Sequence, residues 1–195
     1  MPHYDESTMR IGLDLDGVII DHTQNKIMLA ARYGVTLDPK DTVSEHMSLH
    51  FTPEVYEEIQ QQLYDDTEEA FAAPLMEGAY AGLASIRELG LPYFLISRRK
   101  NPIFALQLLE NRGLWGEYFA PENTFFVETM EDKDIVARRL GVTHYVDDEP
   151  RVLSVMPSVL ERIHFDSRNA YTEPTEFTHV TNWAQLADIL GISHK

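Results

Sequence analysis

The chain has 195 residues, no cysteine, and 32 acidic against 16 basic side chains, which gives a formal net charge of −16. The missing cysteines exclude disulfides, thiolate catalysis and cysteine-ligated zinc, and the negative charge argues against nucleic acid polymers and acidic membranes as partners. No apolar run reaches the roughly 18 residues of a membrane span, and residues 1–9 are polar with no signal-peptide pattern, so we expect a cytoplasmic protein.

Residues 10–20 predict a first strand and its exit loop, after an edge or disordered tail at 1–9. The apolar stretch ends in Asp14-Leu15-Asp16-Gly17, so two carboxylates stand one residue apart at the end of a core strand. Such neighbours repel one another unless a cation lies between them or one of them is protonated. A local conflict of this kind is expected at a functional site.

Residues 22–73 predict a small helical insertion. A helical pattern runs from Gln24 to Tyr33, and Thr52-Pro53 begins a second helix with proline at its first position. Residues 35–51 show no single period, and 65–73 predict an acidic turn or short helix. We therefore expect one α/β domain made of 1–21 and 74–195, interrupted by a small helical domain at 22–73.

After residue 74, predicted helices and strands alternate. Helices are expected at 79–89, 102–112, 132–140 and 183–190, the last one capped by Asn182, with a helical or irregular stretch at 152–160. Further strands are expected at 92–96, 124–127, 144–146 and 162–165. With the first strand, this alternation predicts a doubly wound, Rossmann-like parallel sheet of about five strands with helices on both faces.

Polar residues interrupt the apolar pattern at the carboxyl ends of the predicted strands, where ligands bind in folds of this kind. Asp14 and Asp16 end the first strand, and Lys133 opens the helix between the third and the fourth. The candidate site residues at this edge of the sheet are Asp14, Asp16, Ser97, Arg98, Lys133, Asp147 and Asp148.

Carboxylates that converge from two strand ends suit a hard divalent cation. Mg²⁺ is held by one or two carboxylates together with substrate phosphate, so Asp14 and Asp147 are the expected ligands, with Asp148 as a direct or water-mediated partner. Such an ion attracts a small phosphorylated substrate despite the negative charge of the protein. An aspartate that attacks phosphorus, a second acid, and Ser97 with Lys133 around the phosphoryl oxygens together predict phosphoryl transfer.

These motifs, in this order, resemble those of phosphatases of the haloacid dehalogenase (HAD) superfamily over residues 10–165. A strand that ends in Asp-x-Asp-Gly-Val matches 14–18, and a strand that ends in serine matches 94–97. A lysine ahead of a helix matches Lys133, and a strand that ends in paired aspartates matches Asp147-Asp148. Each motif alone is weak, whereas four in order are specific. One departure is Asp134, which stands where many members carry proline and is a candidate ion-pair partner of the lysine.

The resemblance implies a magnesium-dependent phosphomonoesterase that works through an aspartyl-phosphate. By this resemblance Asp14 would be the nucleophile, and Asp16 would be the general acid and then the base, with its backbone carbonyl on the metal. Ser97 and Lys133 would hold the phosphoryl oxygens. Apart from the resemblance, Arg98 and Arg99 follow the second strand and are candidate contacts for a substrate phosphate or a base, although arginines at such an edge are more often solvated or paired with a local acid. The insertion at 22–73 would be a cap that reads the substrate. The implied metal ligands are Asp14, Asp16, Asp147 and Asp148.

Two alternative functions stay open. The short interval between Lys133 and Asp147 resembles the deoxynucleotidase-like branch, which favours a 5′-nucleotidase acting on nucleoside monophosphates. The alternative of another class is a catalytically silent binding or regulatory protein with the same fold. No motif indicates which phosphate ester is the substrate, or the oligomeric state.

The insertion also contains residues with two interpretations. His22, His46 and His50 suggest a metal site, but only the last two have the spacing of one helix face. The aromatic side chains of the insertion are expected to form its core rather than a platform for a base; they are Phe51, Tyr56, Tyr64 and Phe71.

Overall fold

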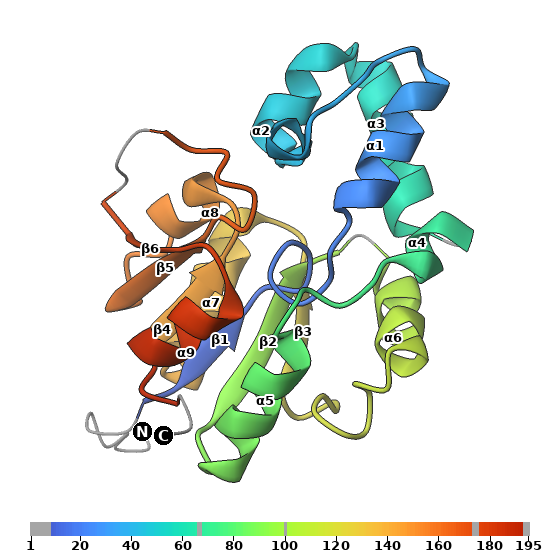
Figure 1. The fold of residues 1–195 in the computed structure, drawn as a ribbon. Helices are drawn as coiled ribbons and strands as arrows, with labels where there is room; N and C mark the ends of the chain where they lie inside the picture. The colour runs from blue at the N-terminus through green and yellow to red at the C-terminus, as the bar shows by residue number, and fades with distance from the viewer. Residues whose placement is uncertain (1–8, 66–67, 100, 173–175, 193–195) are drawn as a thin grey trace.

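The computed structural model describes residues 9–65, 68–99, 101–172 and 176–192, so that most of the tail predicted at 1–9 lies outside the described residues. Within these ranges, six parallel strands form one sheet in the order β3-β2-β1-β4-β5-β6 (Figure 1). The order reverses direction beside β1, where clefts form in sheets of this kind. The strands are β1 (Ile11–Leu13), β2 (Tyr93–Arg98), β3 (Thr124–Val127), β4 (His144–Asp147), β5 (Glu161–Phe165) and β6 (Thr178–Val180).

The doubly wound α/β class is confirmed, and the sheet has six strands among the described residues where the sequence predicted about five. The missed strand is β6, which pairs with β5 in the register Ile163 to Thr178. It has three residues, of which Val180 alone is buried. A strand this short carries no readable alternation, and neighbouring chain rather than its own pattern decides its conformation.

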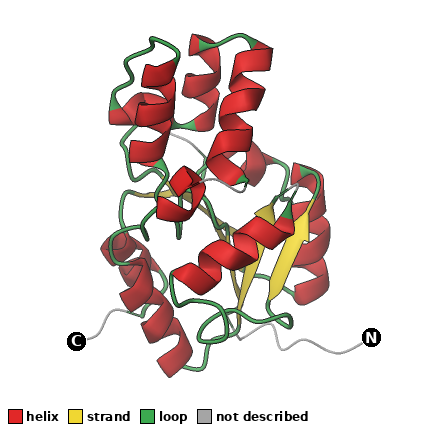
Figure 2. Cartoon of the chain, turned by 90° about the vertical axis from the view of Figure 1, so that its right-hand side faces the viewer, coloured by secondary structure: helices red, strands yellow, loops and turns green. Residues whose placement is uncertain are grey.

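Helices cover both faces of the sheet, as Figure 2 shows from the side. Successive residues of β2 point to opposite faces: Leu95 belongs to one buried cluster, and Phe94 and Ile96 to the other. The first cluster includes residues of α5 (Ala79–Glu88), α6 (Pro102–Asn111) and α9 (Trp183–Ile189). The second includes residues of α7 (Met130–Leu140) and α8 (Pro150–Ser154). The near-continuous apolar character of the strands follows from this burial on both sides.

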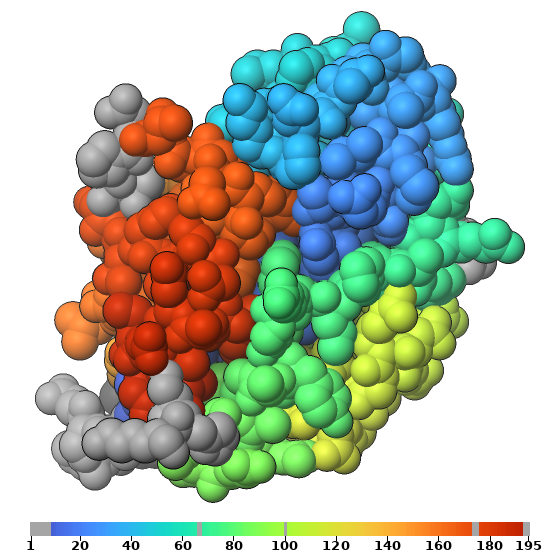
Figure 3. Space-filling model, viewed as in Figure 1, coloured from blue at the N-terminus to red at the C-terminus, as the bar shows by residue number. Residues whose placement is uncertain are grey.

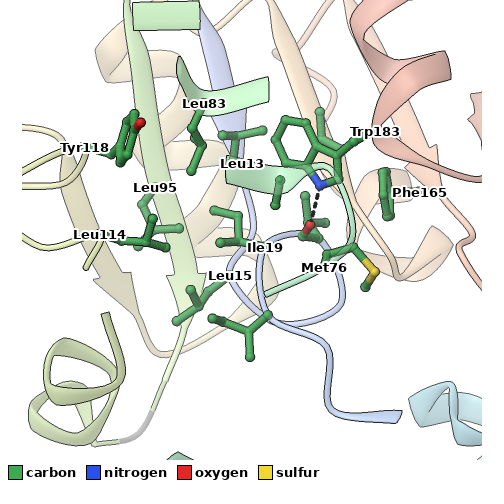
Figure 4. Packing of buried hydrophobic residues seen from close by; sticks show 14 of the residues in the cluster. Leu13, Leu15, Ile19, Met76, Leu83, Leu95, Leu114, Tyr118, Phe165 and Trp183 are labelled. Carbon is green, nitrogen blue, oxygen red and sulfur yellow. Dashed lines mark hydrogen bonds between the residues drawn. The ribbon is translucent and has the colours of Figure 1, made fainter. Parts of the chain in front are cut away.

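The last helix supports the loop that follows β1. Asn182 caps α9, as predicted, by accepting a hydrogen bond from the Gln185 backbone N–H at 2.9 Å. Trp183 donates its indole N–H to the Val18 carbonyl oxygen at 2.8 Å (Figure 4). Its ring also lies against Gly82 of α5, where a Cβ would meet ring carbon at 2.2 Å. The loop after β1 is therefore supported by Trp183 of α9, which packs against α5.

Residues 23–64 form a helical unit with its own apolar cluster, apart from the clusters on the sheet (Figure 1). Helix α3 begins at Pro53 as predicted, with the Thr52 side chain accepting the Val55 backbone N–H. Its elements are α1 (Thr23–Arg32), η1 (Pro39–Thr42), α2 (Ser44–Met47), η2 (Ser48–His50) and α3 (Pro53–Tyr64). The following α4 (Glu68–Ala72) contacts both this unit, through Arg32 and Glu69, and α6, through Phe71 and Phe104, whose ring centroids are 6.4 Å apart.

The helical unit touches the sheet domain beyond β5. In Figure 3 its blue and cyan surface meets the orange surface of the chain that follows that strand. At this contact the Tyr171 hydroxyl lies 3.5 Å from Glu45 Oε2, and its ring centroid lies 5.6 Å from that of His46. None of the helices among the described residues has the length and apolar character needed to cross a bilayer.

Candidate functional site

A cavity of 520 Å³ is lined both by residues at the carboxyl ends of β1, β2 and β4 and by residues of the helical unit. Six of the seven residues predicted for the site line it: Asp14, Asp16, Arg98, Lys133, Asp147 and Asp148. The seventh, Ser97, is 1% exposed within β2 and is not among the lining residues. The structure thus brings together side chains from three strand ends, as the topology predicts.

The chain turns sharply between Asp14 and Ile20. The Asp14 N–H still donates to the Val146 carbonyl of β4 at 3.0 Å, but the strand itself ends at Leu13. Leu15 then accepts the N–H groups of both Ile19 and Ile20, which closes a tight loop. Asp14 and Asp16 are therefore not successive residues on one face of a continuing strand, and each enters its own surroundings.

Gly17 is required at the top of this loop. Its φ is +83°, a conformation that residues with a side chain rarely adopt. A Cβ on Gly17 would lie 2.2 Å from Oδ2 of Asp148. The glycine after the acid pair therefore lets the exit loop of β1 approach the carboxylate that follows β4.

Three carboxylates converge at the centre of the cavity. Oxygens of Asp14, Asp147 and Asp148 all lie within 4.8 Å of one another, and the three side chains are buried. Lys133 Nζ lies 2.8 Å from Asp147 Oδ2 and 3.1 Å from Asp14 Oδ1. The lysine itself is 2% exposed, so that the cluster is a buried group of like charges with one internal cation.

Lys133 lies on α7, as predicted, but the helix begins at a different residue from the one predicted. The helix starts at Met130, two residues before the expected start, because Thr129 and Asp132 form a capping box. Lys133 consequently lies in the second turn and not at the helix opening. Asp134 accepts hydrogen bonds from Ser158, at 3.0 Å from its backbone N–H and 2.6 Å from its hydroxyl, and does not pair with the lysine.

Burial and mutual repulsion shift the acids of the cluster in one direction. Burial raises the pKa of Asp14, and repulsion from Asp16 adds to it against the pull of Lys133. The pKa of Asp147 rises to about 7, through burial first and then through Asp14. That of Asp148 rises well above its usual value for the same kinds of reason. Burial would lower the pKa of Lys133, but Asp14 and Asp147 outweigh it and raise that pKa well above its ordinary value.

This cluster fits a hard divalent cation. Asp14 Oδ1 is buried and accepts no aligned hydrogen bond, although it is close to Lys133. Three carboxylates with raised pKa values are stabilised in their ionised form by a metal ion, and an oxygen-only donor set is the one that Mg²⁺ prefers. The carboxylate of Asp16 is not part of this converging group.

Asp16, at the other side of the cavity, is surrounded by basic side chains and not by acids. Its Oδ1 accepts from Arg99 Nη2 and pairs with His22 Nε2, at 2.7 Å in each case. Burial alone would raise the pKa of Asp16, but Arg99 and His22 outweigh it and lower that pKa far below its usual range. Burial lowers the pKa of His22, with Asp16 only partly opposing it.

Arg99 also joins Asp16 to the helical unit. Its Nη1 donates to the Tyr64 carbonyl at 3.0 Å, and its guanidinium carbon lies 4.5 Å from the centroid of the Tyr64 ring. The ring of His22 meets the same tyrosine edge-on at 5.2 Å. The arrangement connects the acid after β1, the loop after β2 and the end of α3.

Sequence reasoning missed the roles of Arg99 and His22 at this site. Arg99 was expected to be solvated or paired with a local acid, and its actual acid is 83 residues away in the chain. His22 was considered only as a metal ligand of the insertion. Among the described residues, the histidines at 22, 46 and 50 form no group that could hold a metal ion.

The aromatic residues of the insertion divide between two roles. Phe51, Tyr56 and Tyr64 pack against the apolar cluster of the helical unit, as expected, whereas Phe71 packs against the cluster on the sheet. Tyr56 and Tyr64 additionally line the cavity, together with Gln60 and Gln61 of the same helix. Tyr56, Gln60 and Tyr64 follow one another at intervals of four residues on one face of α3, and Gln61 lies beside Gln60.

The sequence matches no family model and no curated protein. Its fold, in contrast, matches solved structures over nearly their whole length. An HAD family hydrolase from Deinococcus radiodurans, solved with bound phosphate and sodium, aligns with a TM-score of 0.64 at 16% identity, over 96% of this chain and 97% of that one.

A predicted phosphatase from Clostridium acetobutylicum aligns at a TM-score of 0.62 and 17% identity, over 94% and 99% of the two chains. An L-2-haloacid dehalogenase aligns at 0.61 and 13%, over 95% and 99%. The chain therefore has the fold of HAD-superfamily hydrolases, as its motifs predicted. Because phosphatases and a dehalogenase both match, the fold by itself does not distinguish these two chemistries.

Proposed function

We propose that this chain, which has the fold of the HAD-superfamily hydrolases, is a magnesium-dependent phosphatase of a small phosphate monoester. The observation that carries the proposal is that Asp14 and Asp16 lie in contrasting surroundings. One lies in a buried acid cluster that fits a cation, and the other is engaged by Arg99 and His22. A cation bound at the cluster would counteract the raised pKa of Asp14 and leave it an ionised nucleophile, whereas Asp16, outside the cluster, is left to exchange a proton once Arg99 releases it.

In this proposal Asp14 is the nucleophile. Its carboxylate oxygen forms a bond to phosphorus while the bond from phosphorus to the ester oxygen breaks, which gives an aspartyl-phosphate and an alcohol. Mg²⁺ bound by Asp14, Asp147 and Asp148, with the Asp16 backbone carbonyl as a further ligand, would neutralise charge on the transferring phosphoryl group. Lys133 favours the ionised form of the nucleophile, against the burial that raises its pKa, and supplies positive charge to the phosphoryl oxygens.

Asp16 is the acid–base residue of the proposal. In the arrangement seen here its carboxylate is held ionised by Arg99 and His22, which is the protonation state of a base, but these contacts also make it a weak one. As Arg99 moves away, Asp16 becomes a stronger base for the water attacking the aspartyl-phosphate. To protonate the leaving oxygen in the first step, it has to be released from Arg99. Because Arg99 also bonds Tyr64, a shift of α3 is the movement that would release it.

The remaining predicted residues take supporting roles. Arg98 lines the cavity from the exposed end of β2 and is a candidate contact for a substrate phosphate. Ser97 lies one residue deeper and would need a local rearrangement to reach a phosphoryl oxygen. We further propose that residues 22–73 act as a small cap over the core made of 1–21 and 74–195, because their helices supply one wall of the cavity.

A nucleoside monophosphate is the second candidate substrate, which would make the chain a 5′-nucleotidase. It is favoured by the face of α3 that lines the cavity, where Tyr56 offers an aromatic ring and Gln60 and Gln61 offer amides. Rings and amides are the groups with which proteins stack and hydrogen-bond bases. The Gln60 amide nitrogen is also buried without a hydrogen-bond partner among the described residues.

A phosphate-release screen tests the proposal. The purified chain is offered alkyl phosphates, sugar phosphates and nucleoside monophosphates, with Mg²⁺ and with excess chelator. We expect release from at least one class, abolished by the chelator and restored by Mg²⁺. No release from any class by a folded chain would instead support the silent binding protein, and release that resists chelation would refute the magnesium requirement.

A further inference from the structure

Six basic side chains line the cavity, and four of them have a carboxylate within 4.0 Å. The paired ones are Arg99 with Asp16, Lys133 with Asp14 and Asp147, Arg151 with Glu149, and Arg168 with Asp21. Among the described residues, Lys26 and Arg98 have no such partner. Arg98 is exposed, so its lack of a partner needs no ligand. Lys26 is different.

Lys26 is a buried ammonium with most of its hydrogen bonds unmade. It lies on α1 and is 4% exposed, and its Nζ donates to the Thr42 carbonyl at 2.9 Å. An ammonium carries three donors, so two have no partner among the described residues. A buried charge without an anion or a full set of hydrogen bonds is strongly unfavourable. Packing does not require this cost, because methionine would fill a similar volume without charge.

A second buried cation lies nearby. The Arg168 side chain, on the loop after β5, is 5% exposed and also lines the cavity. It donates to Thr23 Oγ1 at 2.7 Å and lies 3.2 Å from Asp21 Oδ1. Burial lowers the pKa of Lys26, and Arg168 is the next largest cause of that shift. Asp148, Glu149 and Asp16 act in the opposite direction, but none of them is within ion-pair distance of Lys26.

We propose that Lys26 and Arg168 bind a second anionic group of the substrate, a carboxylate or a second phosphate carried by the alcohol that leaves. The inference rests on the proposed phosphatase function and names its substrate class. An oxyanion accepts hydrogen bonds without donating any, so it complements an ammonium with free donors beside a guanidinium. It also places negative charge between two cations that otherwise repel each other.

The proposal separates the two candidate substrates. An ester with a second oxyanion uses Lys26 and Arg168, whereas a nucleoside monophosphate has no anion beyond the scissile phosphate. The two cations come from different parts of the chain, Lys26 from the helical unit and Arg168 from the sheet domain. A doubly charged substrate would therefore tie these two parts together, and a singly charged one would not.

Calorimetric binding of phosphonates, which are not hydrolysed, tests the inference without relying on turnover. Alkylphosphonates of increasing length are compared, in Mg²⁺, with partners of the same length that end in a carboxylate or in a second phosphonate. At one length we expect the doubly charged partner to bind roughly tenfold to hundredfold more tightly, the usual gain from charge-assisted hydrogen bonds. The carboxylate and phosphonate series identify which oxyanion is preferred.

Lys26→Met and Arg168→Met are expected to reduce this ratio to near one while leaving alkylphosphonate binding almost unchanged. Lys40→Met is the matched control, since Lys40 is an exposed lysine of the same unit outside the cavity, and it should keep the ratio. Thermal melting of each variant verifies folding, and Arg168→Met carries the test if Lys26→Met does not fold.

Three results would overturn the inference: no length of doubly charged phosphonate binds more tightly, the preference survives in both variants, or the variants weaken both ligands equally. The last result would show that Lys26 only balances Asp148 and Glu149 across the cavity. Failure of the proposed function is a separate result, because it appears as absent phosphate release whatever the binding ratio. If the chain releases phosphate but shows no binding preference for a second anion, the proposed phosphatase function is retained and the proposed substrate class is refuted.

Discussion

Asp14 and Asp16 are separated by one residue in the chain, yet their pKa values are shifted in opposite directions. Burial and neighbouring acids raise the pKa of Asp14, whereas Arg99 and His22 hold that of Asp16 far below its usual range. The partners of Asp14 lie on β4 and α7, within the sheet domain. The partners of Asp16 lie at the junction with the helical unit and bond or contact Tyr64 of α3.

This difference teaches how one short motif supplies two functions. The cluster around Asp14 is fixed by strands and by a capped helix, so its geometry does not depend on where the helical unit lies. The surroundings of Asp16 include that unit, so its charge state and orientation follow the position of α3. A nucleophile benefits from fixed geometry, and an acid–base residue has to change its protonation state during the cycle.

Asp14→Asn tests the proposed nucleophile and is the substitution expected to have the largest effect. The amide keeps the shape but cannot attack phosphorus, so we expect kcat/KM for phosphate release to fall by roughly 10⁴-fold or more. Melting temperature and far-ultraviolet circular dichroism serve as folding controls. A variant that keeps its rate within a factor of ten would refute the assignment of the nucleophile.

Replacing Lys133, the cation within the acid cluster, tests the surroundings of Asp14 with a smaller expected effect. Lys133→Met leaves Asp14 and Asp147 without their shared partner and withdraws positive charge from the phosphoryl site. We expect a loss of roughly 10²- to 10³-fold in kcat, as for other groups that stabilise developing charge. Stopped assays of phosphate release at saturating Mg²⁺ measure it, with Lys40→Met as control. An unchanged kcat would mean that the lysine is structural.

The Asp16 side is tested by freeing it from its arginine. In Arg99→Met the pKa of Asp16 should rise, so that this residue is protonated at mildly acidic pH and can no longer act as a base. With p-nitrophenyl phosphate, whose leaving group needs no acid, we expect roughly tenfold slower turnover at acidic pH and little change at alkaline pH.

The control for this experiment is Arg87→Met, a surface arginine paired with Glu117 outside the cavity. The measurement is the pH profile of p-nitrophenol release for the three proteins. If the acidic limb of the Arg99 variant coincides with that of the unchanged chain, Arg99 does not govern Asp16.

The smallest expected effect is the pH dependence of stabilisation by Mg²⁺. The pKa of Asp147 is about 7 in the folded chain, whereas an unfolded carboxyl group titrates near pH 4. Protonation therefore stabilises the metal-free fold at acid pH, and this contribution is lost as pH rises between these two values. Mg²⁺ binds the ionised form, so its stabilisation should grow over the same interval.

We expect the increase in melting temperature on adding Mg²⁺ to be a few degrees larger at about pH 8 than at about pH 5.5. Scanning fluorimetry at both pH values measures this, and Asp147→Asn should remove the dependence. An increase that is equal at both pH values, or larger at the lower one, would argue against a metal site at these carboxylates.

The sheet and most of the acid cluster were predictable because their signals are local. Apolar runs that end in aspartate mark strand ends, and parallel strands bring such ends to one edge. The neighbours of Asp16 were not predictable in this way. Arg99 meets Asp16 and Tyr64 only where α3 packs against the loop after β2, Lys26 comes from α1, and no spacing in the chain encodes these contacts.

Two further details, the start of α7 and the burial of Ser97, were also not readable from the pattern of the chain. The start of α7 was displaced because a Thr–Asp capping box extends the helix beyond its apolar period. Ser97 has the right position in the series, but the structure buries it and presents Arg98 to the cavity. A motif locates a site to within a residue or two, and side-chain packing decides which atoms face the ligand.

The central claim is that the two aspartates divide the reaction between them, and Asp16→Asn separates their steps. With Mg²⁺ and p-nitrophenyl phosphate the first step needs no acid, whereas hydrolysis of the aspartyl-phosphate needs the missing base. We expect a burst of one p-nitrophenolate per chain, followed by slow turnover and a phosphoryl group on Asp14 in the mass spectrum. Sustained turnover without a burst, or a phosphoryl group on any other residue, would contradict the account.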